Sequence, residues 1–216
     1  QSSVGTNWGV GDIMYADLDG DGKISNGTNK LGDTGDYRII GNSTPRFKYG
    51  ITLDAAWKGF DFSIFMQGIG KRDLWLDGCY FWGANGQGNE WQSTGFAEHW
   101  DFFRPEGDPL GANLNSYYPR VNFSGDRNTK VQTRYLQNGA YLRLKNVQLG
   151  YTLPRVWTEK AGISSVRVYV SGDNLATITS LSKIFDPEAT GSLAGTGSGK
   201  LYPLQRVISV GVNVNF

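Results

Sequence analysis

The chain has 216 residues, a formal net charge of +1 and 19% charged residues. It is rich in glycine, with 30 residues, and in aromatic side chains, at 13%, while helix-favouring stretches are scarce, so the composition predicts an all-β protein. The sequence has no basic run, no apolar run of about 18 residues and no second cysteine, which excludes a nucleic-acid partner, a membrane-spanning helix and an internal disulfide framework.

An Asp-rich stretch within residues 1–45 has the spacing of a calcium-binding loop. Asp17, Asp19 and Asp21 stand at its first, third and fifth positions, glycine stands at the sixth, and Lys23 is expected to contribute its backbone carbonyl. We expect a structural calcium ion here, because calcium prefers several oxygen ligands around one point. The alternative is an Asp- and Gly-rich turn without metal.

The acid that normally closes such a loop is replaced, because position 12 is Thr28. Asp33 and Asp36 follow shortly afterwards, and we place Asp36 in the predicted ligand set. No helical pattern flanks the loop, so we expect it to pin a segment in place and not to act as a helix–loop–helix calcium sensor.

Two alternating segments predict a β-hairpin. Apolar residues occupy every second position over residues 47–57 and again over residues 60–67, and Lys58 and Gly59 form a two-residue turn between them.

The connection over about residues 71–138 is rich in aromatic residues beside Asn, Asp and Gln. Such a composition suits stacking on sugar rings or on a partner surface. The candidates for substrate or lid contact are Trp75, Trp82, Trp91 and Trp100. The alternative is that so long a loop builds its own small core. We expect His99 to be packed or exposed and Cys79 to be an inert thiol, because neither has a partner for zinc or catalysis.

Three further strands are predicted. The first covers about residues 140–153, with a bulge near Lys145 where the apolar alternation changes phase. The second begins near Val166, and the third covers residues 202–216. The connection over about residues 181–200 contains a Gly-, Ser- and Lys-containing run that lacks the spacing of a phosphate-binding loop.

The last strand carries the strongest signal in the chain. Every second residue is apolar, namely Ile208, Val210, Val212, Val214 and Phe216, and most of the intervening residues are small or polar. A soluble protein rarely exposes such a strand, whereas a strand between lipid and a watery lumen requires this alternation. The pattern predicts a protein of the outer membrane of a Gram-negative bacterium, in contact with its lipid.

Short and long connections alternate along the chain. In outer-membrane barrels short turns face the periplasm and long loops face outward, so residues 1–45, 71–138 and 181–200 are expected outside the cell. Five strands cannot close a barrel. Because the chain also begins at Gln1 without a signal peptide, we expect a fragment or processed product whose remaining strands lie upstream.

Together these features resemble the C-terminal portion of a SusC/RagA-family TonB-dependent outer-membrane transporter of Bacteroidetes. The matching stretches are residues 11–13, 17–24, 39–46, 60–63, 67–68, 141–147, 149–151, 172–175, 186–188 and 202–216. The final run also resembles the signal read by the outer-membrane assembly machinery, at Ser209, Gly211, Val214 and Phe216.

The resemblance implies a 22-stranded transmembrane β-barrel with a plugged lumen, of which this chain supplies the last five strands and their loops. It further implies import of oligosaccharides or oligopeptides, a SusD-like surface lipoprotein that acts as a lid, and energy coupling to the TonB complex through an N-terminal part that is absent here. No enzymatic activity is implied.

The residues also allow two other functions. One is a soluble secreted β-sandwich that binds glycans, with a structural calcium site. The other is a glycoside hydrolase that uses Asp186 and Glu188, but no opposing carboxylate accompanies them in the sequence and they fall within the family-like pattern.

Overall fold

The computed structural model describes residues 4–86, 88, 95–190 and 201–216. The chain divides into two compact units, which are described separately. The loop unit comprises Gln1–Gly41, Trp75–Leu136 and Thr190–Leu201, and the sheet unit comprises Asn42–Leu74, Gln137–Ala189 and Tyr202–Phe216.

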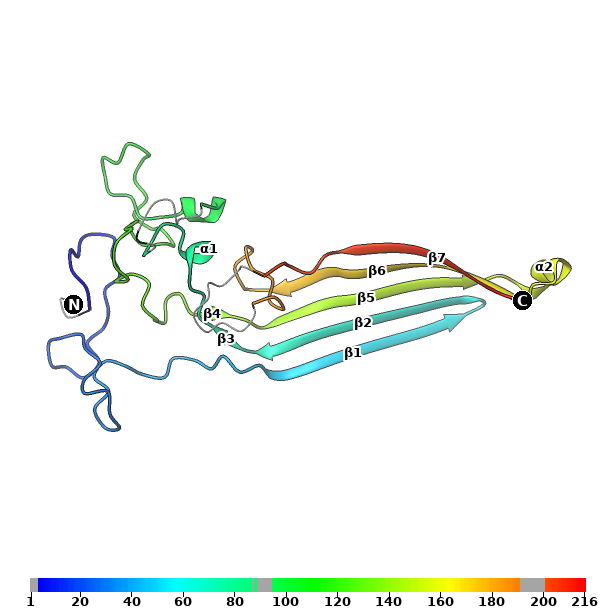
Figure 1. Ribbon diagram of the computed structural model, residues 1–216, viewed down its shortest axis with the longest axis horizontal. Coiled ribbons are helices and arrows are strands. Elements are labelled where there is room, and N and C mark those ends of the chain that lie inside the picture. Colours follow the sequence, from blue (N-terminus) through cyan, green and yellow to red (C-terminus); the bar gives the residue numbers. More distant parts are fainter. Residues whose placement is uncertain (1–3, 87, 89–94, 191–200) are drawn as a thin grey trace. The chain divides into compact units, whose positions relative to one another are not determined.

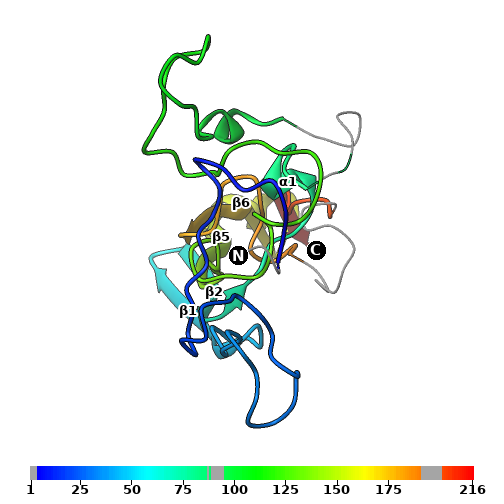
Figure 2. The same cartoon turned by 90° about the vertical axis from the view of Figure 1, so that its left-hand side faces the viewer.

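The sheet unit is built on one antiparallel sheet of five strands (Figure 1). Its strands are β1 (Arg46–Trp57), β2 (Phe60–Lys71), β5 (Tyr141–Thr152), β6 (Ser165–Thr179) and β7 (Val207–Asn215), paired in that order. Figure 2 views the strands end-on, where β1, β2, β5 and β6 follow one another in the same order. The sheet is open, because β1 and β7 form its two edges.

The smaller elements divide between the two units. Two-residue strands β3 (Asp73–Leu74) and β4 (Gln137–Asn138) pair with each other in the sheet unit. The turn between β5 and β6 in that unit contains α2 (Arg155–Thr158) and η3 (Glu159–Ala161). The loop unit contains α1 (Cys79–Trp82) and η2 (Ala97–Trp100). No helix in the described ranges is both long and apolar enough to span a membrane.

The predicted hairpin is confirmed. β1 and β2 pair from Trp57 opposite Phe60 to Arg46 opposite Lys71. Lys58 and Gly59 between them have φ angles of 47° and 88°. Two central residues with positive φ give the turn whose twist matches that of the flanking strands, so the strands continue directly from it.

The predicted bulge at Lys145 is also confirmed. Leu144 pairs with Met66 and Asn146 pairs with Phe65, so Lys145 is the extra residue in β5. The apolar residues before and after Lys145 alternate in opposite phase. The extra residue at the bulge compensates for this change, so that both sets of apolar side chains lie on the same face of the sheet.

Each face of the sheet collects one kind of residue. A row across all five strands on one face contains Ala55, Phe62, Leu149, Val170 and Val210. The next row, on the opposite face, contains Asp54, Ser63, Gln148, Ser171 and Ser209. The sheet therefore has one apolar and one polar face, as the alternation predicts.

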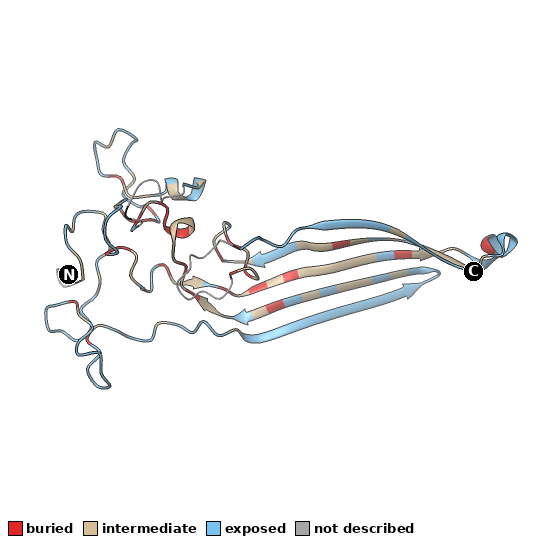
Figure 3. Cartoon of the chain, in the orientation of Figure 1, coloured by how far each residue is buried: buried red, intermediate tan, exposed pale blue. Residues whose placement is uncertain are grey.

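The apolar face is not covered by protein within the described residues. Ile208, Val210 and Val212 are 71%, 76% and 58% exposed, and Figure 3 shows β1 and β7 exposed along most of their length. A β-sandwich needs a second sheet over such a face, whereas the other sheet described consists only of β3 and β4. The soluble sandwich therefore has no support in this structure.

The last strand is shorter than predicted, because it begins at Val207 and not at residue 202. Before β7, the backbone of Leu204 and Gln205 forms hydrogen bonds with side chains and not with a neighbouring strand. The N–H of Leu204 donates to the Asp186 carboxylate at 3.1 Å, and the carbonyl of Gln205 accepts from the Asn174 side chain at 3.0 Å.

The long connection builds its own aromatic core in the loop unit, as the alternative interpretation of its composition predicts. Phe81, Trp82, Tyr118 and Tyr135 are at most 5% exposed. Their rings meet edge to face or stacked, with the centroids of Trp82 and Tyr135 4.8 Å apart. Such contacts fix an irregular segment by burying large apolar rings.

Candidate functional site

The Asp-rich loop brings three carboxylates together. One side-chain oxygen from each of Asp17, Asp19 and Asp21 lies within 4.8 Å of the others. The loop curls because the Asp17 carboxylate accepts from the N–H groups of Gly20 at 2.6 Å and Gly22 at 2.8 Å. Both glycines have φ near 80°, a conformation that side chains disfavour.

Asp36 returns to this loop from further along the chain. Its two carboxylate oxygens accept from the N–H groups of Leu18 at 2.5 Å and Ser25 at 2.8 Å. Asp33, the other candidate for closing the loop, instead accepts from the N–H and hydroxyl of Thr28. Residues 28–33 therefore form a small turn of their own, and Asp36 is the acid that contacts the loop.

The carboxylates of the loop differ in their electrostatics. Hydrogen bonds from the Leu18 and Ser25 backbone hold the pKa of Asp36 below its ordinary value. For Asp19, the backbone hydrogen bond from Asp21 lowers the pKa, but partial desolvation and the neighbouring carboxylates together raise it. Crowded oxygens of this kind match the ligand chemistry of calcium, which would offset their repulsion.

The four predicted tryptophan contacts have different positions. Trp82 lies in the aromatic core, 2% exposed, and its indole N–H donates to the carbonyl of Leu76 at 3.0 Å. Trp75 is half-buried, with its ring 5.7 Å from that of Trp82. Trp100 is 60% exposed. Trp91 lies outside the described residues. Of the three predicted contact tryptophans that the structure describes, Trp75 and Trp100 thus present surface for a contact.

Arg104 holds the segment that carries Trp100. Its guanidinium donates to the carbonyls of Gly111 at 2.7 Å and Trp100 at 2.9 Å and lies against the Phe102 ring at 4.8 Å. The exposed indole of Trp100 is therefore attached to an ordered backbone.

His99 is packed in the loop unit, which is one of the two placements expected from the sequence. Its Nδ1 accepts from the N–H of Phe96 at 3.1 Å and its Nε2 lies 3.1 Å from the carbonyl of Phe81. Both ring nitrogens therefore serve to hold the loop.

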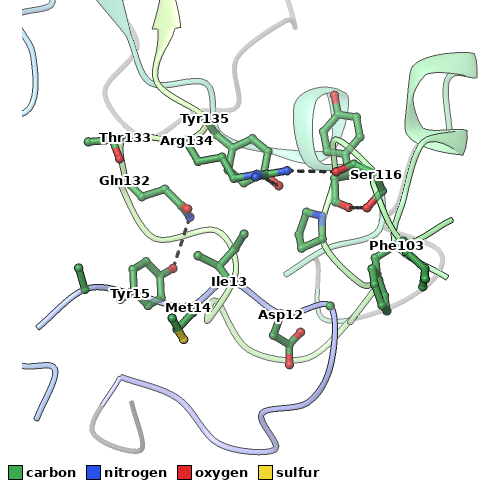
Figure 4. Close-up of a pocket in the computed structure, with 15 residues that line it drawn as sticks. Asp12, Ile13, Met14, Tyr15, Phe103, Ser116, Gln132, Thr133, Arg134 and Tyr135 are labelled. Carbon is green, nitrogen blue, oxygen red and sulfur yellow. Dashed lines mark hydrogen bonds between the residues drawn. The ribbon is translucent and has the colours of Figure 1, made fainter. Parts of the chain in front are cut away.

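The loop unit also contains a cavity of about 480 Å³ that the sequence did not indicate (Figure 4). Its walls come from residues 11–16, 103, 114, 116, 118, 119 and 132–135. Tyr15 and Gln132 project into it, joined by a hydrogen bond of 3.4 Å. No sequence signal finds this cavity, because separate segments of the chain form it.

A buried acid ties the first of these segments to the long connection. Asp12, whose side chain is 2% exposed, accepts from Arg120 at 2.6 Å and Asn128 at 2.8 Å and lies 3.4 Å from Arg127. Burial raises the pKa of Asp12, but the hydrogen bonds from Arg120 and Asn128 outweigh it, and the pKa lies below its ordinary value. Asp12 is therefore charged and structural.

Asp186 and Glu188 are held by ion pairs in the sheet unit. The Arg143 guanidinium lies 2.7 Å from Asp186 and 3.2 Å from Glu188, and the Lys145 ammonium lies 3.0 Å from Glu188. The two acids thus attach the connection between β6 and β7 to β5. They do not face each other across a cleft, which is the arrangement that glycoside hydrolysis needs.

The residues of the predicted assembly signal lie on β7 and at its end. Ser209 pairs with Ser171, Gly211 with Tyr169, and Val214 with Val166. Phe216 is 90% exposed. A Cβ atom at Gly211 would collide with the ring of Tyr169, so the packing of this ring also explains why glycine occupies the position.

Comparison with known proteins places these features in context. No family model matches the sequence. TonB-dependent receptor P3 of Formosa agariphila is 33% identical over 216 residues, which cover 95% of this chain and 19% of the receptor. TonB-dependent receptor P26 of the same organism is 30% identical over 217 residues, which cover 96% of this chain and 20% of that receptor.

Solved structures give the same result. The RagAB peptide importer in its open-open state matches with a TM-score of 0.62 and 27% identity, over 83% of this chain and 18% of the importer chain. The structure of the RagAB peptide transporter matches with a TM-score of 0.63 and 28% identity, with the same coverage. The chain thus spans about a fifth of the length of the receptors it resembles.

Proposed function

Because this chain belongs to the SusC/RagA-type TonB-dependent receptors, we propose that it forms part of the barrel wall and the extracellular loops of an outer-membrane importer. The observation that carries this proposal is the five-stranded sheet with an uncovered apolar face and a polar face. An apolar face exposed over all five strands is unfavourable in water and favourable in a bilayer.

The strand lengths fit the same role. β1, β2 and β5 have 12 residues each, β6 has 15 and β7 has 9. A tilted transmembrane strand needs about 9–11 residues. The polar face then lines the lumen, where Arg167 forms an ion pair with Asp61 on β2.

The ends of the sheet differ as they do in outer-membrane barrels. The two-residue turn at Lys58 and Gly59 and the short connection through α2 lie at one end, and the long connections leave from the other (Figure 1). We place the short turns in the periplasm and the long loops outside the cell.

We propose an oligosaccharide or an oligopeptide as the imported substrate and a SusD-like surface lipoprotein as the lid. The RagAB structures, which are described as a peptide importer and a peptide transporter, support an oligopeptide and a two-component assembly. Coupling to the TonB complex would use parts of the receptor outside this chain. Exposed Trp100 and half-buried Trp75 are the contact residues we propose in the extracellular loops.

We further propose that Asp17, Asp19, Asp21 and Asp36 bind a structural calcium ion, with the carbonyl of Lys23 as a further ligand. The clustered carboxylate oxygens support this assignment. In the intact receptor, we expect residues 17–36 to resist protease better in calcium than in a chelator. Asp19→Asn is expected to abolish this difference. Equal protection of the parent with calcium and with chelator would contradict the proposal.

The membrane role is tested by placing a charge on each face of the sheet. Val210→Arg on the apolar face is expected to destabilise the intact receptor in lipid vesicles by about 2–4 kcal/mol, because an arginine at mid-bilayer depth must leave water. Ser171→Arg, from the adjacent row on the polar face, is the matched control and should cost far less. Denaturant unfolding in vesicles measures both. If Val210→Arg unfolds and assembles like the parent, the apolar face does not contact lipid.

A further inference from the structure

The connection between β5 and β6 carries an exposed apolar pair that the barrel wall does not require. Val156 and Trp157 in α2 are 72% and 67% exposed. Short periplasmic turns need only close a hairpin and are ordinarily polar. Two large apolar side chains on such a turn therefore indicate contact with something other than water.

The turn is an ordered structure that directs these side chains outward. Thr158 is 5% exposed, and its backbone carbonyl accepts from the N–H of Ile163 at 3.2 Å. Gly162, with φ of 72°, ends the turn and donates to the carbonyl of Glu159 at 3.0 Å. These hydrogen bonds close the turn, while the side chains of Val156 and Trp157 remain exposed.

Aromatic residues gather at the same end of the sheet. Phe60 and Tyr151 pair across β2 and β5 with ring centroids 4.5 Å apart. Trp57 is 70% exposed and Phe216, at the end of the chain, is 90% exposed. Figure 1 shows the C-terminus beside the α2 turn. Aromatic side chains concentrate at the boundary between hydrocarbon and lipid headgroups.

Basic side chains accompany this aromatic end. Arg155 and Lys160 flank the apolar pair and are exposed, and Lys58 lies over the Trp57 ring at 4.9 Å. None of the three has a carboxylate within 4.0 Å among the residues that the structure describes. Unpaired cations next to interfacial aromatics match the phosphate groups of phospholipids.

We propose that the turn over residues 155–161 is a membrane anchor that inserts Trp157 and Val156 at the headgroup level of the periplasmic leaflet. Arg155 and Lys160 bind the lipid phosphates, with a preference for anionic lipids. The inference rests on the proposed membrane role of the sheet, and it adds that this turn lies on the bilayer and not in the periplasmic solution.

The test uses the intact receptor labelled with fluorotryptophan, in bilayers of phosphatidylethanolamine and phosphatidylglycerol. Fluorine NMR signals of Trp157 and Trp57 are assigned by their loss in Trp157→Phe and Trp57→Phe. A phospholipid spin-labelled near its glycerol backbone should abolish the Trp157 signal, and a water-soluble gadolinium chelate should leave most of it.

The outcomes separate the anchor from the membrane role. If the lipid label abolishes the Trp57 signal but spares that of Trp157, the proposed anchor is wrong and the proposed barrel wall is supported. This conclusion holds whether gadolinium reaches Trp157 or protein shields it. If the lipid label spares both signals, the membrane role fails as well.

The charge component has its own comparison. Spin-labelled phosphatidylglycerol should weaken the Trp157 signal more than spin-labelled phosphatidylcholine does, and the double variant Arg155→Gln with Lys160→Gln should lose this difference. An equal effect of the two lipids on the parent would overturn the proposed preference for anionic headgroups.

Discussion

Single residues in this chain are explained by their neighbours across the strands. Gly211 pairs with Tyr169, whose ring occupies the space that a side chain at Gly211 would need. Gly68 stands in the same relation to Tyr49 on β1. In both pairs a glycine allows a tyrosine ring to lie flat across the neighbouring strand.

This arrangement gives a prediction for Gly211. Gly211→Val is expected to destabilise the receptor in vesicles by about 1–3 kcal/mol, because the new side chain overlaps the Tyr169 ring. The double variant Gly211→Val with Tyr169→Ala should recover most of that loss, as measured by denaturant unfolding. If the double variant remains as impaired as the single one, Gly211 acts through the assembly signal and not through packing.

At the scale of elements, the connection between β6 and β7 is attached to β5 by charge. The Arg143 side chain is 5% exposed, that of Asp186 is 8% exposed, and they lie 2.7 Å apart. Asp186 in turn accepts from the N–H groups of Glu188 at 2.9 Å and Leu204 at 3.1 Å. One ion pair therefore organises both ends of the connection.

Arg143→Met is expected to release this connection. The change leaves Asp186 buried without its cation, and breaking a buried pair in this way costs about 3–5 kcal/mol. Hydrogen exchange at the Leu204 and Glu188 amides should become much faster. Lys145→Met is the matched control: it removes an ammonium that is 22% exposed from Glu188 alone, so its effect should be smaller.

The dependence on pH checks the same ion pair. Burial raises the pKa of Asp186, but hydrogen bonds from Arg143 and from the Glu188 and Leu204 backbone outweigh it and lower the pKa overall. Because its pKa is lower in the folded state, the ionised Asp186 stabilises the fold at pH values above the ordinary aspartate pKa of about 3.9. This stabilisation is lost as the pH falls through the pKa that Asp186 has in the folded state. Protection of the Leu204 amide should therefore survive to lower pH in the parent than in Arg143→Met. Identical pH profiles would contradict this account.

At the scale of the whole molecule, the sheet exposes apolar residues along its whole length and has two unpaired edges. Both features favour association with lipid or with further strands. The 216-residue chain by itself is therefore not expected to be stable as a monomer in water.

This expectation is checked by heating the isolated chain in detergent-free buffer. We expect aggregation or a broad, uncooperative transition, whereas the intact receptor in detergent should unfold cooperatively. A sharp reversible transition of the isolated chain as a monomer would show that its apolar face is covered in some other way.

Local sequence patterns were sufficient to predict the five long strands, apart from the start of β7, together with the hairpin turn and the two faces of the sheet. Alternation of period two predicted the apolar row through Val210, the phase change predicted the bulge at Lys145, and the residue pair Lys58 and Gly59 predicted the hairpin. These features depend on local geometry, because successive side chains of a strand must point to opposite faces. The family resemblance rested on the same local patterns.

The contacts among loop residues could not be predicted from local sequence patterns. Trp82 and Trp100 look equivalent in the sequence, yet the first lies in the aromatic core and the second is 60% exposed. Asp12 joins Arg120 and Arg127 across more than a hundred residues, and Asp186 joins Arg143 across 43. Loops have no repeating geometry that would place such partners, so their contacts follow from how the whole chain packs.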